Sequence, residues 1–125
     1  MAGNKDVFFP TTSRFVDKTG TAATVVDLIL AGANGSKVLV LQASCGAGSV
    51  EILYHDGSIS HVIWADGAVV SNINVLLDVA GTEFLVYPVT SAGNTYFNMA
   101  AGSKLELSLI GGGSTGSAKV YVEDY

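Results

Sequence analysis

The stretch that decides the fold is residues 50–64, VEILYHDGSISHVIW. It contains two β-rich runs separated by Asp56-Gly57, a dipeptide that tolerates the positive φ angles of a tight hairpin. With a two-residue turn at Asp56-Gly57, His55 pairs with Ser58, and the pairing continues to Val50 opposite Ile63. The stretch predicts an antiparallel hairpin, and its predicted buried face consists of Val50, Ile52, Tyr54, Ile59 and Ile63.

Two further segments predict which faces of their strands are buried. Leu105, Leu107 and Leu109 alternate with polar residues, which is the two-residue period of a half-buried strand. The run Val38-Leu39-Val40-Leu41 has no polar alternation, which predicts a strand covered on both faces. The N-terminal segment or a neighbouring subunit would cover the second face of this strand.

The rest of the chain repeats this pattern of short β-rich segments and turn signals. Fifteen glycines and frequent Val, Ile and Thr disfavour helices. We expect an all-β fold, a single β-sandwich or jelly-roll-like domain of about eight to nine short strands. Residues 1–23 are predicted to form an extended N-terminal arm and residues 24–125 the sandwich. The expected strands are 24–30, 36–45, 49–55, 58–64, 68–79, 83–89, 94–99, 103–110 and 117–123.

Composition narrows the class of protein. Hydrophobic residues make up 49% of the chain and charged residues only 14%, against about 25% charged in an average soluble domain. This surplus of apolar residues suggests that other subunits cover part of the surface. No apolar run is long enough to cross a membrane. The net charge of −5, without a basic cluster, argues against nucleic-acid binding.

No residue pattern predicts a catalytic, cofactor or metal site, and we expect a protein that is not an enzyme. His55, His61 and Asp56 form the nearest approach to a metal or acid–base cluster, but the predicted register places the two histidines on opposite sheet faces. Cys45, the only cysteine, is expected to be a buried thiol. The glycine-rich segments 46–48 and 111–116 lack the helix and lysine of a phosphate loop.

Aromatic side chains are the candidate binding residues. Phe8, Phe9 and Phe15 lie on the predicted arm, and apolar side chains on such a segment can insert into grooves of a partner. Trp64 is predicted to be a core residue or an interface anchor. As an alternative, Trp64 with Tyr54, Tyr87 and Tyr96 would form a sugar-binding platform.

Four short segments carry a family resemblance. Residues 30–38, LAGANGSKV, followed by residues 50–57, VEILYHDG, resemble a turn and hairpin of a family of small tailed-bacteriophage structural proteins. Residues 97–105, FNMAAGSKL, are similar to a later element of that pattern, and the acidic, aromatic ending Glu123-Asp124-Tyr125 is similar as well.

The resemblance implies a β-sandwich virion protein, most specifically a capsid decoration or cement protein. Its expected partners are the major capsid protein and further copies of itself, with a trimer as the favoured order. The expected location is the capsid surface of the virion, after synthesis in the host cytoplasm, and neither a cofactor nor a membrane or nucleic-acid partner is expected. The alternatives are a tail, baseplate or head-fibre domain, and a carbohydrate-binding module used in host attachment.

Overall fold

The computed structural model describes residues 12–21, 23–66, 70–75, 89–91 and 94–125. Within these ranges every regular element is a β-strand, and all strand pairs are antiparallel. In chain order the strands are β1 (Thr12–Thr21), β2 (Val25–Leu30), β3 (Ser36–His55), β4 (Ser60–Asp66), β5 (Val70–Asn74), β6 (Val89–Ser91), β7 (Asn94–Met99) and β8 (Lys104–Asp124).

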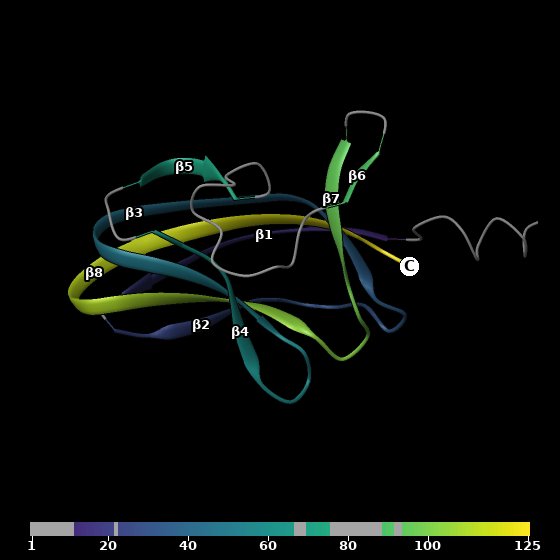
Figure 1. Ribbon diagram of the computed structural model, residues 1–125, viewed down its shortest axis with the longest axis horizontal. Helices are drawn as coiled ribbons and strands as arrows, with labels where there is room; N and C mark the ends of the chain where they lie inside the picture. Colours follow the sequence, from purple (N-terminus) through teal and green to yellow (C-terminus); the bar gives the residue numbers. More distant parts are fainter. Residues whose placement is uncertain (1–11, 22, 67–69, 76–88, 92–93) are drawn as a thin grey trace, which may run out of the picture.

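The two longest strands, β3 and β8, pair with each other from Ser36 opposite Asp124 to His55 opposite Lys104, with shifts of register on the way. This ladder bends sharply near its middle (Figure 1). At the bend the register passes from Ala47 to Ser49 on β3 but from Thr115 to Ile110 on β8. The additional residues of β8 give it the longer path around the outside of the curve, because bulges bend a strand without ending its pairing.

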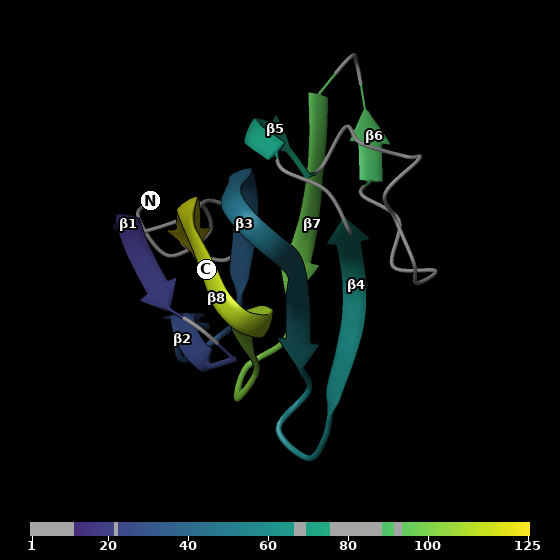
Figure 2. The ribbon, with the colours of Figure 1, turned by 90° about the vertical axis from the view of Figure 1, so that its left-hand side faces the viewer.

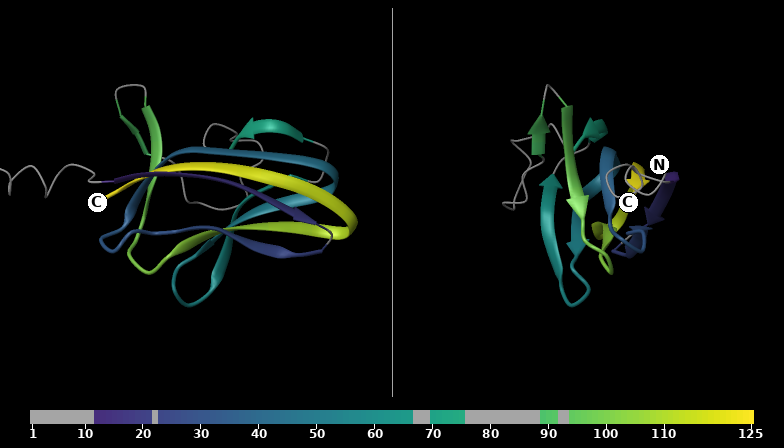
Figure 3. Two further views of the ribbon diagram at one scale, coloured as in Figure 1. Left: turned by 180° about the vertical axis from the view of Figure 1, so that it is seen from behind. Right: turned by 90° about the vertical axis from the view of Figure 1, so that its right-hand side faces the viewer.

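The bend folds one ladder into two layers. The first layer contains β1, residues 115–124 of β8 and residues 36–45 of β3. It also contains β5 and β7, each of which pairs with β3. The second contains β2, residues 104–110 of β8, residues 49–55 of β3, and β4. Figure 2 shows β1 and β2 at one side and β4 at the other, and Figure 3 shows the bend from behind. The arrangement is that of a β-sandwich.

The core lies between the layers. β8 supplies Leu105, Leu107 and Leu109 to one side of it and Ala118, Val120 and Val122 to the other, and all six are at most 2% exposed. β3 likewise contributes Val38 and Leu41 before the bend and Val50 and Ile52 after it. Period-two alternation therefore predicted the inward face of β8 correctly.

The all-β class is confirmed, whereas the jelly-roll arrangement and the N-terminal arm are not. Residues 12–21 form β1, which pairs with β8 from Thr12 opposite Asp124 to Thr21 opposite Thr115. The predicted pairs of short strands, 36–45 with 49–55 and 103–110 with 117–123, are instead the two long strands β3 and β8. The prediction for residues 83–89 lies almost entirely outside the described residues.

The predicted hairpin exists, but its register was wrong. The turn spans four residues, 56–59, with His55 opposite Ser60 and the Asp56 amide donating to the Ile59 carbonyl at 3.0 Å. Ile59 is 58% exposed at the tip rather than buried. Asp56 explains the longer loop, because its Oδ1 accepts hydrogen bonds from the amides of Ser58 (2.8 Å) and Ile59 (2.9 Å).

Two turn glycines provide a matched test of the fold. Gly35 and Gly102 both have positive φ, +90° and +83°. A Cβ at Gly35 would lie 2.6 Å from the Met99 carbonyl oxygen, whereas one at Gly102 would meet nothing within 4 Å. We expect Gly102→Ala to lower the free energy of unfolding by about 1–2 kcal/mol, the backbone cost alone. Gly35→Ala should cost about 3 kcal/mol or more.

Urea unfolding of both variants measures the difference. Equal losses would show that the close approach of Gly35 to Met99 does not constrain the turn.

Candidate interaction surfaces

Five large apolar side chains are exposed in the described part of the chain, and they lie on the outside of the two layers or at their ends. They are Phe15 (59%), Val25 (57%), Leu30 (60%), Ile59 (58%) and Ile110 (45%). Exposed apolar area of this kind marks candidate contact surfaces, because its burial against a partner is favourable.

The first candidate is the outer face of the first layer, which we call the Phe15 face and define by Phe15, Asp17, Lys37, Val40, Lys119, Tyr121 and Glu123. Phe15 lies opposite Tyr121, and Tyr121 lies opposite Val40, so the three form a row across β1, β8 and β3. Tyr121 also donates to Ser13 Oγ at 3.2 Å. Tyr121 and Val40 are partly buried, and Phe15 is open to solvent.

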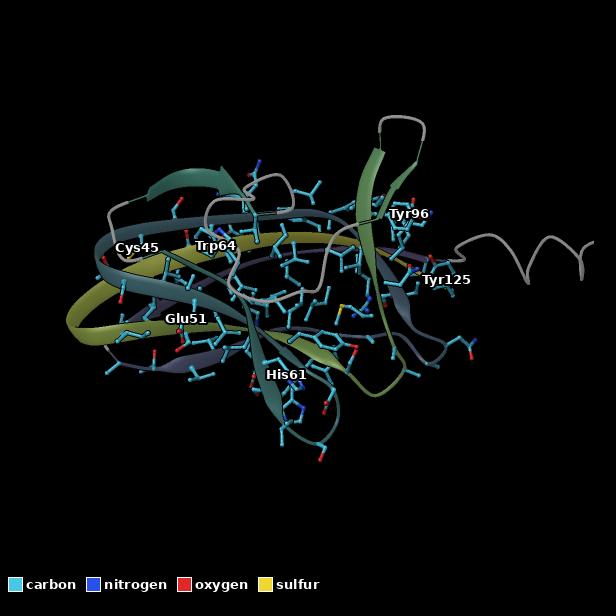
Figure 4. All side chains as sticks on the ribbon, viewed as in Figure 1. Cys45, Glu51, His61, Trp64, Tyr96 and Tyr125 are labelled. Carbon is cyan, nitrogen blue, oxygen red and sulfur yellow. The ribbon has the colours of Figure 1, made fainter. Side chains whose placement is uncertain are left out.

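The second candidate is the outer face of the second layer, which we call the Leu30 face and define by Val25, Asp27, Leu30, Glu51, Lys104, Glu106 and Ile110. Leu30 borders a hollow of about 200 Å³ that is also lined by His55, Gly57 and Lys104. Glu51 projects from the lower half of β3 in Figure 4. Acidic groups outnumber basic ones on this face.

A hydrogen-bonded charge cluster stabilises the centre of the Leu30 face. Glu106 is only 7% exposed, and Ser60 donates to its Oε1 at 2.6 Å. Lys104 Nζ lies 3.6 Å from Glu106 Oε2 and 2.9 Å from Asp27 Oδ1. The hydrogen bond to Asp27 raises the pKa of Lys104 above its usual value. Each of these two carboxylates therefore has a hydrogen-bond or ion-pair partner.

A clamp at the open end of the sandwich ties both layers together. Arg14 holds Asp124 with two hydrogen bonds, from Nε to Oδ2 (2.7 Å) and from Nη2 to Oδ1 (2.8 Å). Its Nη2 also donates to the Leu30 carbonyl at 2.7 Å, which links β1 to β2. Ser36 donates to Asp124 Oδ1 at 2.6 Å and accepts from the Gly32 amide at 2.8 Å. The Arg14 guanidinium holds the pKa of Asp124 below its usual value.

The histidine and aspartate cluster proves to be a hairpin brace. His61 Nε2 lies 2.8 Å from Asp56 Oδ2, and this contact, with the two loop amides, holds the pKa of Asp56 well below its usual range. His55 Nδ1 instead accepts from the Gly57 amide at 3.1 Å. In the described ranges, no group of three or more His, Cys, Asp or Glu side chains is placed to hold a metal ion.

The predicted aromatic anchors have different positions. Phe15 is exposed on β1, and Phe8 and Phe9 lie outside the described residues. Trp64 is 0% exposed in the core (Figure 4), so its ring offers no surface to a sugar or a partner. The reason is a bulge at Ile63, which turns two consecutive residues of β4 inward. Tyr54 is partly buried and accepts from the Ala100 amide at 3.2 Å, and Tyr87 lies outside the described residues.

Cys45 is buried beside the bend, as the sequence predicts. No described helix has the length and apolarity needed to cross a membrane. No protein-family model matches the chain, and no curated protein matches it.

The clamp predicts how stability depends on pH. Because the folded state lowers the pKa of Asp124 below 3.8, its contribution to stability is fully present above about pH 4 and is lost as the pH falls further. We expect Asp124→Asn to lower the free energy of unfolding by about 2–3 kcal/mol at pH 7, since it removes a charge-assisted bidentate pair.

Thermal unfolding from pH 7 to pH 2 measures this effect. The gap between wild type and Asp124→Asn should close below pH 4. Asp27→Asn, which removes a carboxylate whose side chain is 53% exposed, serves as the control and should cost less. A gap that stays constant over this range would contradict the role of the ionised Asp124.

Proposed function

We propose that the chain is a virion structural protein that acts by binding other proteins, most specifically a capsid decoration protein on the outer head lattice. The single observation that carries a binding role is the exposure of Leu30, Val25 and Ile110 together on the Leu30 face. A low-charge chain that leaves such side chains exposed gains free energy when another surface covers them.

The phage assignment is supported by the sequence motifs around the turns. Residues 30–38 and 50–57 resemble elements of tailed-phage structural proteins, and both lead into the hollow beside Leu30, which Ala31, His55 and Gly57 help to line. We assign the Leu30 face to the capsid partner, because the hollow can receive an apolar side chain from the shell. Phe8 and Phe9 remain proposed as further anchors.

A tail, baseplate or head-fibre role would use the same faces. The location of the chain in the virion separates these alternatives. We expect cryo-electron microscopy of the phage that carries this gene to place the chain on the outer head lattice. Density confined to the tail would overturn the decoration role, and absence from the particle would overturn the virion role.

The docking surface can be tested with a matched pair of variants. Leu30→Asp adds a negative charge within the proposed contact, and Asn34→Asp adds the same charge at an exposed turn outside it. We expect heads bearing the Leu30→Asp protein to lose the chain and to rupture at a lower temperature, because a carboxylate would be buried without a partner. Heads bearing Asn34→Asp should match the wild type.

The contribution of Phe8 and Phe9 requires a deletion that ends before β1. Removal of residues 1–23 would take away β1 and with it the Arg14 clamp, so it would test folding rather than docking. Removal of residues 1–11 leaves all described strands in place. Unchanged heat resistance of heads bearing this shorter chain would exclude the two phenylalanines as anchors.

A further inference from the structure

The Phe15 face has a charge pattern that complements itself. Glu123, Tyr121 and Lys119 are alternate residues of β8, so their side chains project from the same side of the sheet. The aromatic ring thus lies between one negative and one positive group. On the adjacent strands, Phe15 and Val40 extend the apolar row to both sides of Tyr121.

We propose that this face binds a second copy of the chain in a face-to-face contact with two-fold symmetry, centred on Tyr121, and we thus favour a dimer over the trimer that the family resemblance implies. A two-fold axis perpendicular to β8 and lying in the interface places Glu123 of each copy opposite Lys119 of the other. The apolar row of Phe15, Tyr121 and Val40 then meets its own copy in the middle. The contact is isologous, as in most symmetric dimers.

The charges also select the orientation. A two-fold axis parallel to β8 would instead place Glu123 against Glu123 and Lys119 against Lys119, and such like-charge contacts are unfavourable. Of these two axes, only the perpendicular one pairs opposite charges on both sides of the apolar row. The interface therefore has one favoured geometry rather than a general tendency to associate.

The Phe15 face and the Leu30 face differ in net charge. The outward-facing Asp17 and Glu123 are balanced by Lys119 and Lys37, so two Phe15 faces can approach without net repulsion although the chain carries −5 overall. On the Leu30 face Asp27, Glu51 and Glu106 accompany a single lysine, Lys104. Two copies of that face would repel each other.

The sequence of β3 gives an independent reason to expect that a second molecule covers the outer face of this strand. In the run from Val38 to Leu41, Val38 and Leu41 are 0% exposed in the core, while Leu39 and Val40 are only partly buried. A second copy on the Phe15 face would cover Val40 from outside. This accounts for apolar residues at positions where a solvent-facing strand usually has polar ones.

Sedimentation velocity of the full chain over a range of concentrations tests the proposal. We expect a reversible dimer in the wild type, which Phe15→Ser abolishes. Lys119→Glu and Glu123→Lys should each weaken the dimer about tenfold or more, because each creates repulsion at two symmetric points. Lys18→Glu is the matched control: Lys18 is exposed on β1, but its position alternates to the other side of the strand.

Mixing the two charge-reversal variants gives the decisive result. In an equimolar mixture of Lys119→Glu and Glu123→Lys chains, both symmetric contacts of the mixed dimer again pair Glu with Lys. We expect its dissociation constant to return to within about threefold of the wild type. A folding defect in either variant could not be repaired in this way.

Three outcomes would overturn the proposal: a wild type that stays monomeric or forms a trimer, a Lys18→Glu variant weakened as much as Lys119→Glu, or a mixture that fails to recover. The measurement needs no virion, so its failure would leave the capsid role to be decided by the location of the chain.

Discussion

The antiparallel ladder between β3 and β8 is the interaction on which the rest of the structure depends. β1 and β2 pair with β8, and β4, β5 and β7 pair with β3, so among the described strands only β6 is attached through another strand. Because the same two strands run through both layers, the bend near Ala47 aligns the inner residues of one half with those of the other. The same ladder thus determines both which strands pair and which side chains meet in the core.

The sequence predicted what depends on local pattern. Leu105, Leu107 and Leu109 alternate in a way that fixes their inward face, and the turn at Gly35 follows from the Asn-Gly dipeptide. The continuity of β3 and β8 could not be predicted, because glycines at 46–48 and 111–116 give the same local signal for a turn as for a bulged bend. The difference lies in long-range pairing, such as Cys45 opposite Gly116.

The candidate surfaces could not be predicted from the sequence either, because they depend on the strand register. Phe15 was predicted to bind a partner from its apolar character in a polar segment, but nothing in the sequence placed Tyr121 beside it. Arg14 and Asp124 lie 110 positions apart and meet only because β1 adds to the far end of β8. Trp64 lies in the core, one of the two positions predicted for it, and the reason is local: one extra residue in β4 at Ile63 reverses the alternation that would have exposed it.

The two faces that we propose as binding surfaces are built from the same strands but lie on different layers. Since side chains alternate along β8, a residue that faces outward in one half has no contact with the outward residues of the other half across the bend. Tyr121 and Glu106 can therefore serve different partners, and a change at one need not disturb the other. A neutral face that pairs with itself and an acidic, apolar face with a hollow are chemically distinct, which favours two kinds of contact over one. A dimer formed through the Phe15 faces would leave both Leu30 faces free and directed away from each other, so that each dimer could hold two further protein surfaces at once.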